Sequence, residues 1–98
     1  MTYATVFLAP EPSLFYFGDP LQHVQSLMSR DLYQKIGVLF TEKTGEAAAE
    51  EMFDLSNNPS REHERAERWG RYRSLSVGDV VHVNDESFLC SAIGWVKL

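Results

Sequence analysis

Five arginines lie between positions 61 and 73. Their type and spacing indicate a binding function more directly than those of any other residues in this chain. A guanidinium group can bind phosphate or carboxylate, so the cluster could contact nucleic acid or an acidic protein surface. Two aromatic residues lie among the arginines, and Arg, Trp and Tyr are the residue types that dominate binding energy at protein interfaces. The candidate partner-binding residues are therefore Arg61, Arg65, Arg68, Trp69, Arg71, Tyr72 and Arg73.

The basic cluster contrasts with the rest of the chain. The whole chain has a net charge of −5. Residues 61–73 carry five basic and three acidic side chains, a net charge of +2, whereas the remainder carries −7. An acidic chain is a poor general binder of nucleic acid, because phosphate contacts supply most of the non-specific affinity. The favoured partner is therefore a protein or a protein–nucleic acid complex. Direct nucleic-acid binding by the Arg61–Arg73 stripe remains the alternative.

A second candidate surface is acidic. Glu46, Glu50 and Asp54 are spaced four residues apart and would lie on one side of a helix. Such a row is either a solvated helix face or a strip that mimics phosphates and docks on a basic partner. The sequence does not decide whether the acidic helix 46–54 or the basic stripe 61–73 is the functional surface.

Sequence motifs for catalysis, metals and cofactors are absent. The chain has no glycine-rich phosphate loop and no nucleophile elbow. Its three histidines are isolated in sequence, and one cysteine, Cys90, does not supply the recurring ligand spacing of a zinc site. We expect Cys90 to be a small buried apolar residue. We also expect no metal, no cofactor and no enzymatic activity.

Length and composition indicate one small globular domain over residues 1–98. The hydrophobic content of 44% is that of a folded protein rather than a disordered one. No apolar run approaches the roughly 20 residues that span a bilayer. The N-terminus lacks the positive charge that opens a signal peptide. These features predict a cytoplasmic protein that does not associate with membranes.

The hydrophobic pattern predicts alternating strands and helices over the first half of the chain. Residues 2–8 and 14–17 are rich in β-branched and aromatic side chains and predict strands. Gly18-Asp19-Pro20 is typical of a helix start, followed by an apolar stripe to residue 32. The apolar run 36–40 predicts a short buried strand.

Two further helices are expected before the C-terminal strands. The first begins at Thr44 or Gly45 and ends near Ser56, with an inward face that comprises Ala49, Met52, Phe53 and Ser56. The second covers about 61–69, with Ser60 as its N-cap. This second helix has little apolar surface, so we expect it to pack modestly, chiefly through Ala66 and Trp69.

The C-terminal third predicts a β-hairpin. Gly78 permits a sharp turn, and Asp79 can accept hydrogen bonds from neighbouring backbone N–H groups. A strand over 80–83 and a return over 88–92 follow. A loop of two or four residues between them places His82 on one face and the apolar residues on the other, namely Val81, Val83, Phe88, Cys90 and Ala92. A last short strand covers 94–98. The fold class is α+β, a mostly antiparallel sheet of about five strands with two to three helices packed on it.

The segment 73–76 before the hairpin has two readings. Arg73, Ser74 and Ser76 could form an exposed loop that presents two hydroxyls and the guanidinium groups of Arg71 and Arg73. They could equally form a turn whose hydroxyls satisfy local backbone groups, which is the reading we favour.

Several of these residues carry a resemblance. The sequence AEEMFDLSNNP at 49–59, RSLSVGDVV at 73–81, Phe88-Leu89-Cys90 and Gly94-Trp95 is similar to YodL-like domains in short uncharacterised proteins of phages, plasmids and integrated elements. The resemblance covers about residues 46–98. It implies a setting of host interaction or of maintenance of the mobile element, and no particular reaction. The leading hypothesis is a small non-catalytic binding module of mobile-element type, with an anti-defence inhibitor as its specific form.

Overall fold

The protein is an α+β domain with a five-stranded antiparallel sheet, as the sequence predicts. The computed structural model describes residues 2–10, 30, 32–92 and 94–98. The expected strand 14–17 and nearly all of the expected helix 20–32 lie outside these residues. The strands are β1 (Thr2–Leu8), β2 (Gln34–Thr41), β3 (Val80–Val83), β4 (Glu86–Ser91) and β5 (Gly94–Lys97). Their order in the sheet is β2-β1-β3-β4-β5.

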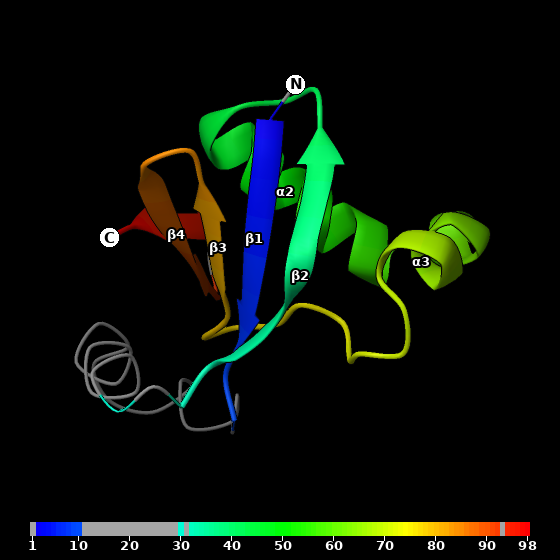
Figure 1. Ribbon diagram of the computed structural model, residues 1–98, viewed down its shortest axis with the longest axis horizontal. Coiled ribbons are helices and arrows are strands. Elements are labelled where there is room, and N and C mark those ends of the chain that lie inside the picture. Colours follow the sequence, from blue (N-terminus) through cyan, green and yellow to red (C-terminus); the bar gives the residue numbers. More distant parts are fainter. Residues whose placement is uncertain (1, 11–29, 31, 93) are drawn as a thin grey trace.

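Helical structure in the described part of the chain lies between β2 and β3. It comprises α2 (Gly45–Asn57), the 3₁₀ turn η2 (Pro59–Arg61) and α3 (Glu62–Arg68). Helix α2 lies across one face of the sheet, and α3 lies beyond the β2 edge (Figure 1). None of these helices is long and apolar enough to cross a membrane.

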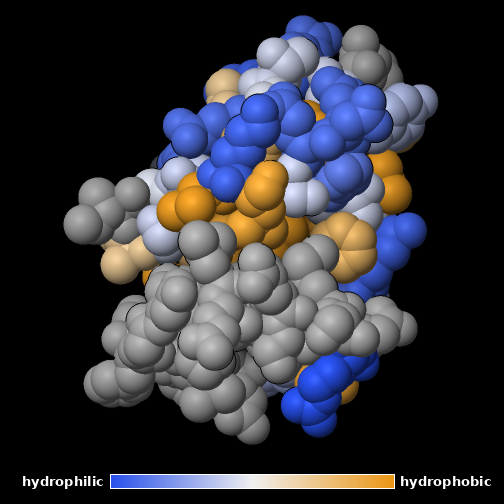
Figure 2. Space-filling model, turned by 90° about the vertical axis from the view of Figure 1, so that its left-hand side faces the viewer, coloured by the Kyte–Doolittle hydropathy of each residue, from blue (hydrophilic) through white to orange (hydrophobic). Residues whose placement is uncertain are grey.

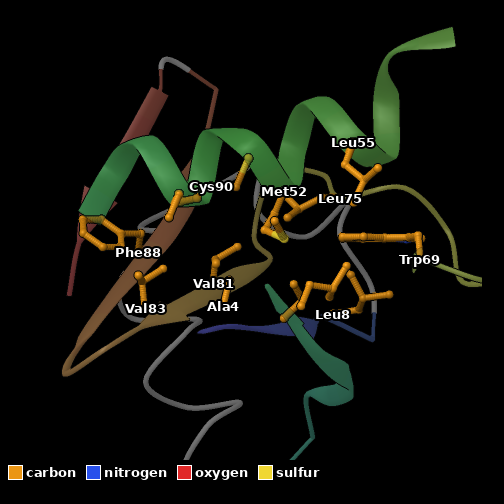
Figure 3. Packing of buried hydrophobic residues seen from close by; sticks show 14 residues of the cluster. Ala4, Leu8, Met52, Leu55, Trp69, Leu75, Val81, Val83, Phe88 and Cys90 are labelled. Atoms are coloured by element: carbon orange, nitrogen blue, oxygen red, sulfur yellow. The ribbon is translucent and has the colours of Figure 1, made fainter. Parts of the chain in front are cut away.

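The core lies between α2 and the sheet. Strand β1 alternates strictly, so that Ala4, Val6 and Leu8 are buried toward α2. In Figure 3 the side chains of the sheet point up to Met52 and Leu55 of α2, while the Trp69 ring closes one end of the core. A smaller cluster on the other face of the sheet comprises Ala9, Val80 and Leu89, with Phe7, Tyr33 and Val77 packed against it.

The C-terminal hairpin has the two-residue loop that was one of the predicted options. Val83 pairs with Glu86 and Val81 with Phe88, across a turn at Asn84-Asp85. Asn84 has a φ of 54°, a conformation that Asn tolerates better than most residues. The predicted inward residues of both strands are buried, and His82 lies on the opposite face. Ala92 is an exception, because it follows the end of β4 and is exposed.

Strand β2 corrects one prediction. The apolar run 36–40 was expected to be buried, but β2 is an edge strand of the described sheet, and the described elements bury only one of its faces. Leu39 points into the core, whereas Val38 and Phe40 are 47% and 48% exposed. The apolar run therefore predicted the strand correctly. Its predicted burial was wrong, because burial depends on which elements cover the sheet.

The two helices agree with prediction in their positions and differ in detail. Helix α2 begins at Gly45 and buries Ala49, Met52 and Ser56 as expected, while Phe53 is only partly buried. The N-cap of α3 is Arg61 rather than Ser60, and it makes no side-chain capping bond. The preceding 3₁₀ turn η2 is capped by Asn58, whose side chain accepts a hydrogen bond from the Ser60 N–H. Trp69 is buried as expected, but Ala66 is exposed, so α3 itself buries no side chain.

A fully buried carboxylate joins the ends of several elements. The two Asp79 oxygens accept hydrogen bonds from the two terminal nitrogens of Arg73, both at 2.7 Å. The same oxygens accept the backbone N–H groups of Ala9 at 2.8 Å and Ser76 at 2.7 Å. The Tyr33 hydroxyl donates to the Gly78 carbonyl at 2.7 Å, next to this carboxylate. Asp79 thus holds together the end of β1, the segment 73–76 and the start of β3.

We predict that Arg73→Ala lowers the free energy of unfolding by about 3–5 kcal/mol, because it leaves the buried Asp79 carboxylate without its counter-ion. Arg71→Ala is the matched control. Arg71 is an exposed arginine two positions away, with no bond to the described residues, and its loss should change stability by less than about 0.5 kcal/mol. Urea unfolding followed by circular dichroism measures both. Equal stabilities of the two variants would contradict the structural role of Arg73.

Candidate functional site

Arg61 is surrounded by carboxylates of the protein itself. Its guanidinium group contacts Glu51, Asp54 at 2.8 Å and Glu64 at 2.8 Å. The hydrogen bonds from Arg61 and then Arg68 lower the pKa of Glu64 to about 2, and the bond from Arg61 also lowers the pKa of Asp54. Because α3 buries no side chain, these ion pairs are a principal link between η2, α3 and helix α2.

Arg65 and Arg68 also bind within the chain. Arg65 donates to three carbonyl oxygens, those of Ser56 at 3.0 Å, Gly70 at 3.2 Å and Tyr72 at 2.7 Å. It therefore fastens the turn after α3 to the end of α2. Arg68 pairs with Glu64 at 2.7 Å, and its second terminal nitrogen donates to the Phe40 carbonyl at the free edge of β2.

The remaining predicted residues divide into two whose side chains are bonded within the chain and two whose side chains have no bond to the described residues. Trp69 is the buried one among the four. The Trp69 indole N–H donates to the Arg73 carbonyl at 2.9 Å, and Arg73 holds Asp79. Of the seven predicted residues, Arg71 and Tyr72 keep exposed side chains for which the described residues supply no hydrogen bond. Most of the predicted stripe is therefore engaged in bonds within the chain. Its partner-binding role stays a prediction.

Segment 73–76 is bonded to the rest of the protein, but not as predicted, because its bonds are not made by hydroxyls to local backbone groups. The Ser74 hydroxyl donates to the Ser56 carbonyl at 2.6 Å, and the Ser76 backbone N–H donates to Asp79. Asn57 donates to the Leu75 carbonyl at 2.9 Å. The segment is bonded to the end of α2 and forms part of the framework.

A group of exposed apolar side chains lies on strands β1 and β2, on the face of the sheet opposite α2. We call Tyr3, Val38 and Phe40 the β2 surface. Tyr3 and Phe40 are cross-strand partners whose ring centroids are 4.5 Å apart at an interplanar angle of 58°. Tyr3 is 55% exposed. These residues come from the two neighbouring strands that face the viewer in Figure 1.

A charged cleft adjoins the β2 surface, because Phe40 contributes to both. The cleft has a volume of about 480 Å³ and lies between the end of β2 and α3, lined by Phe40, Thr41, Glu42, Lys43, Glu51, Arg61, Glu64 and Arg68. All three cations of the cleft form ion pairs. Lys43 pairs with Glu51 at 3.1 Å, and Arg61 and Arg68 form the pairs described above. The cleft therefore presents paired charges to a partner rather than an excess of either sign.

Sequence reasoning missed the β2 surface. The alternation in β1 could have revealed it, since Tyr3 is out of phase with the apolar residues at 4, 6 and 8. The signal in β2 was weaker, because a continuous apolar run does not show which side is open. Val96 and Leu98 are also exposed, at the β5 edge. Figure 2 looks onto the side that carries β4 and β5 and shows apolar surface next to hydrophilic residues.

Within the described residues, no three His, Cys, Asp or Glu side chains are grouped so that they could hold a metal ion. Comparison of the chain with family models, curated proteins and solved structures gave no match.

We predict that the link between α3 and α2 weakens in acid. The lowered pKa of Glu64 means that its bond to Arg61 stabilises the folded protein fully above the ordinary pKa of 4.5. This stabilisation is lost as the pH falls from there toward about 2. The difference in unfolding free energy between the wild type and Arg61→Gln should therefore shrink over this range. Urea titrations at several pH values measure it. A difference independent of pH would show that Arg61 does not act through these carboxylates.

Proposed function

We propose that the protein is a small non-catalytic module that binds a macromolecular partner, and that the β2 surface is its contact. The observation that carries the proposal is the exposed Tyr3–Phe40 pair on the face of the sheet opposite α2. Aromatic rings that are fixed by cross-strand pairing supply large contact areas at low entropic cost. Their exposure together with Val38 is more typical of an interface than of a solvated sheet face.

The surroundings of the β2 surface favour a protein partner. Arg68 lies at the Phe40 carbonyl, and the charged cleft continues from there toward Lys43. An apolar centre with a rim of charged groups is the usual arrangement of protein–protein interfaces.

The alternative, nucleic-acid binding through the Arg61–Arg73 stripe, has less support. Arg61, Arg65, Arg68 and Arg73 already bond to carboxylates or carbonyls of this chain. To bind phosphate, they would have to give up these partners. Arg71 is the exposed arginine of the stripe that no described residue engages, and the overall charge of −5 opposes phosphate contacts.

The specific form of the proposal is an inhibitor of a host defence complex, carried by a mobile element. Its support is the resemblance of residues 46–98 to YodL-like mobile-element proteins.

The double variant Tyr3→Ser/Phe40→Ser tests the proposal. The protein is immobilised, exposed to host lysate with and without nuclease, and the retained proteins are identified by mass spectrometry. We expect the wild type to retain a discrete protein or complex after nuclease treatment. The double variant should bind it at least about 30-fold more weakly, since loss of a hot spot costs about 2 kcal/mol or more.

Val96→Ser is the matched control, because Val96 is an exposed apolar residue on the opposite edge strand. It should leave retention unchanged. If retention instead disappears with nuclease, falls steeply with salt and is reduced by Arg71→Glu, the nucleic-acid alternative is correct. If the double variant and the control bind equally well, the β2 surface is not the contact.

A further inference from the structure

A second hollow lies on the other side of the molecule, between α2 and strands β4 and β5. Its volume is about 340 Å³, within the range of small ligand sites. Phe53 of α2 and Trp95 of β5 form its aromatic walls and pack against the core, while Cys90 of β4 lines it as well. Glu50 supplies the ionisable carboxylate among these walls. We call this the α2–β5 hollow.

The carboxylate of Glu50 is held in place by Trp95. The Trp95 indole N–H donates to Glu50 Oε2 at 2.8 Å, which orients the carboxylate without neutralising it. No basic side chain in the described part of the chain forms an ion pair with Glu50. By contrast, Glu51 and Asp54 on the same helix are both paired with Arg61.

The thiol of Cys90 is a buried, uncharged part of the hollow's wall, and two carboxylates lie near it. Burial raises the pKa of Cys90 to about 12, and the charges of Asp79 and Glu50 add to the effect. The thiol therefore stays neutral at physiological pH and is a poor nucleophile. The contribution of Glu50 is consistent with a negative potential that extends into the hollow.

We propose that the α2–β5 hollow receives the side chain of a lysine or arginine from a partner protein. The methylenes would lie on the Trp95 and Phe53 rings, and the cationic end would meet the Glu50 carboxylate. A cation over an indole ring gains further from the ring quadrupole. This contact lies apart from the β2 surface and goes beyond the function proposed above.

Charge complementarity identifies the occupant as basic. Glu46 lies one turn before Glu50 on the same side of α2, is exposed, and has no ion pair with the described residues. It could engage a second basic residue of the same partner segment. The chain carries −5 overall, which steers basic partners toward it. Of the acidic row Glu46, Glu50 and Asp54, the first two are thus available to a partner, whereas Asp54 is occupied.

Nuclear magnetic resonance tests the proposal on the intact protein, because its two tryptophans give two indole N–H signals. Trp95→Phe assigns them, and the Trp69 indole, bonded to the Arg73 carbonyl, is the internal reference. The probes are the capped tripeptides Gly-Arg-Gly and Gly-Lys-Gly, with Gly-citrulline-Gly as the uncharged control. We expect the basic peptides to shift the Trp95 signal saturably and to leave the Trp69 signal in place. Glu50→Gln should weaken this binding by about three- to fivefold, the effect expected from loss of an exposed ion pair.

Three results would overturn the proposal. These are the absence of a Trp95 shift with either basic peptide, an equal shift with the citrulline peptide, and undiminished binding by Glu50→Gln. Tighter binding of tetramethylammonium than of both peptides would also overturn it, since the site would then serve a free small cation. Phe40→Ser should bind the peptides as the wild type does. The peptide experiment therefore tests the α2–β5 hollow independently, even if the lysate experiment shows that the β2 surface does not bind a partner.

Discussion

The pairing of Arg73 with Asp79 is the interaction on which the rest of the structure depends. A carboxylate that is fully removed from solvent is costly unless its charge and lone pairs are compensated. Here a two-pronged guanidinium group and two backbone N–H groups compensate it. One of these N–H groups belongs to Ala9, far away in sequence. The pair therefore holds the end of β1 beside the start of β3, and it also holds the turn that starts the hairpin.

The same use of arginine recurs in the helical layer. Helix α3 contributes no buried side chain of its own, yet it is held at α2 and at the edge of β2 by Arg61, Arg65 and Arg68. The basic cluster that first suggests a binding surface thus joins helices, turns and a strand edge. The exposed surfaces left over are apolar on the β2 side and acidic on the α2–β5 side. Both suit a protein partner better than a polyanion.

Local patterns were sufficient to predict much of the fold. The alternation in β1, the periodicity of α2 and the turn residues of the β3–β4 hairpin each encode their element within a few residues. The roles of Arg73 and Phe40 could not be predicted in this way. Their partners, Ala9 and Tyr3, are tens of residues away, and no periodicity records such a distance. The candidate site was therefore predicted less well than the framework, since exposure depends on the packing of distant elements.

The position of β1 in the sheet has a consequence for how the chain folds during synthesis. β1 lies between β2 and β3, and Ala4 pairs with Val83 near the other end of the chain. β1 is therefore synthesised well before β3, and the two strands can pair only after all of the intervening chain has been made. Such long-range pairing slows folding and exposes unpaired strand edges in the meantime. The nascent chain is most vulnerable to misassociation and proteolysis in the interval between synthesis of β1 and synthesis of the C-terminal hairpin.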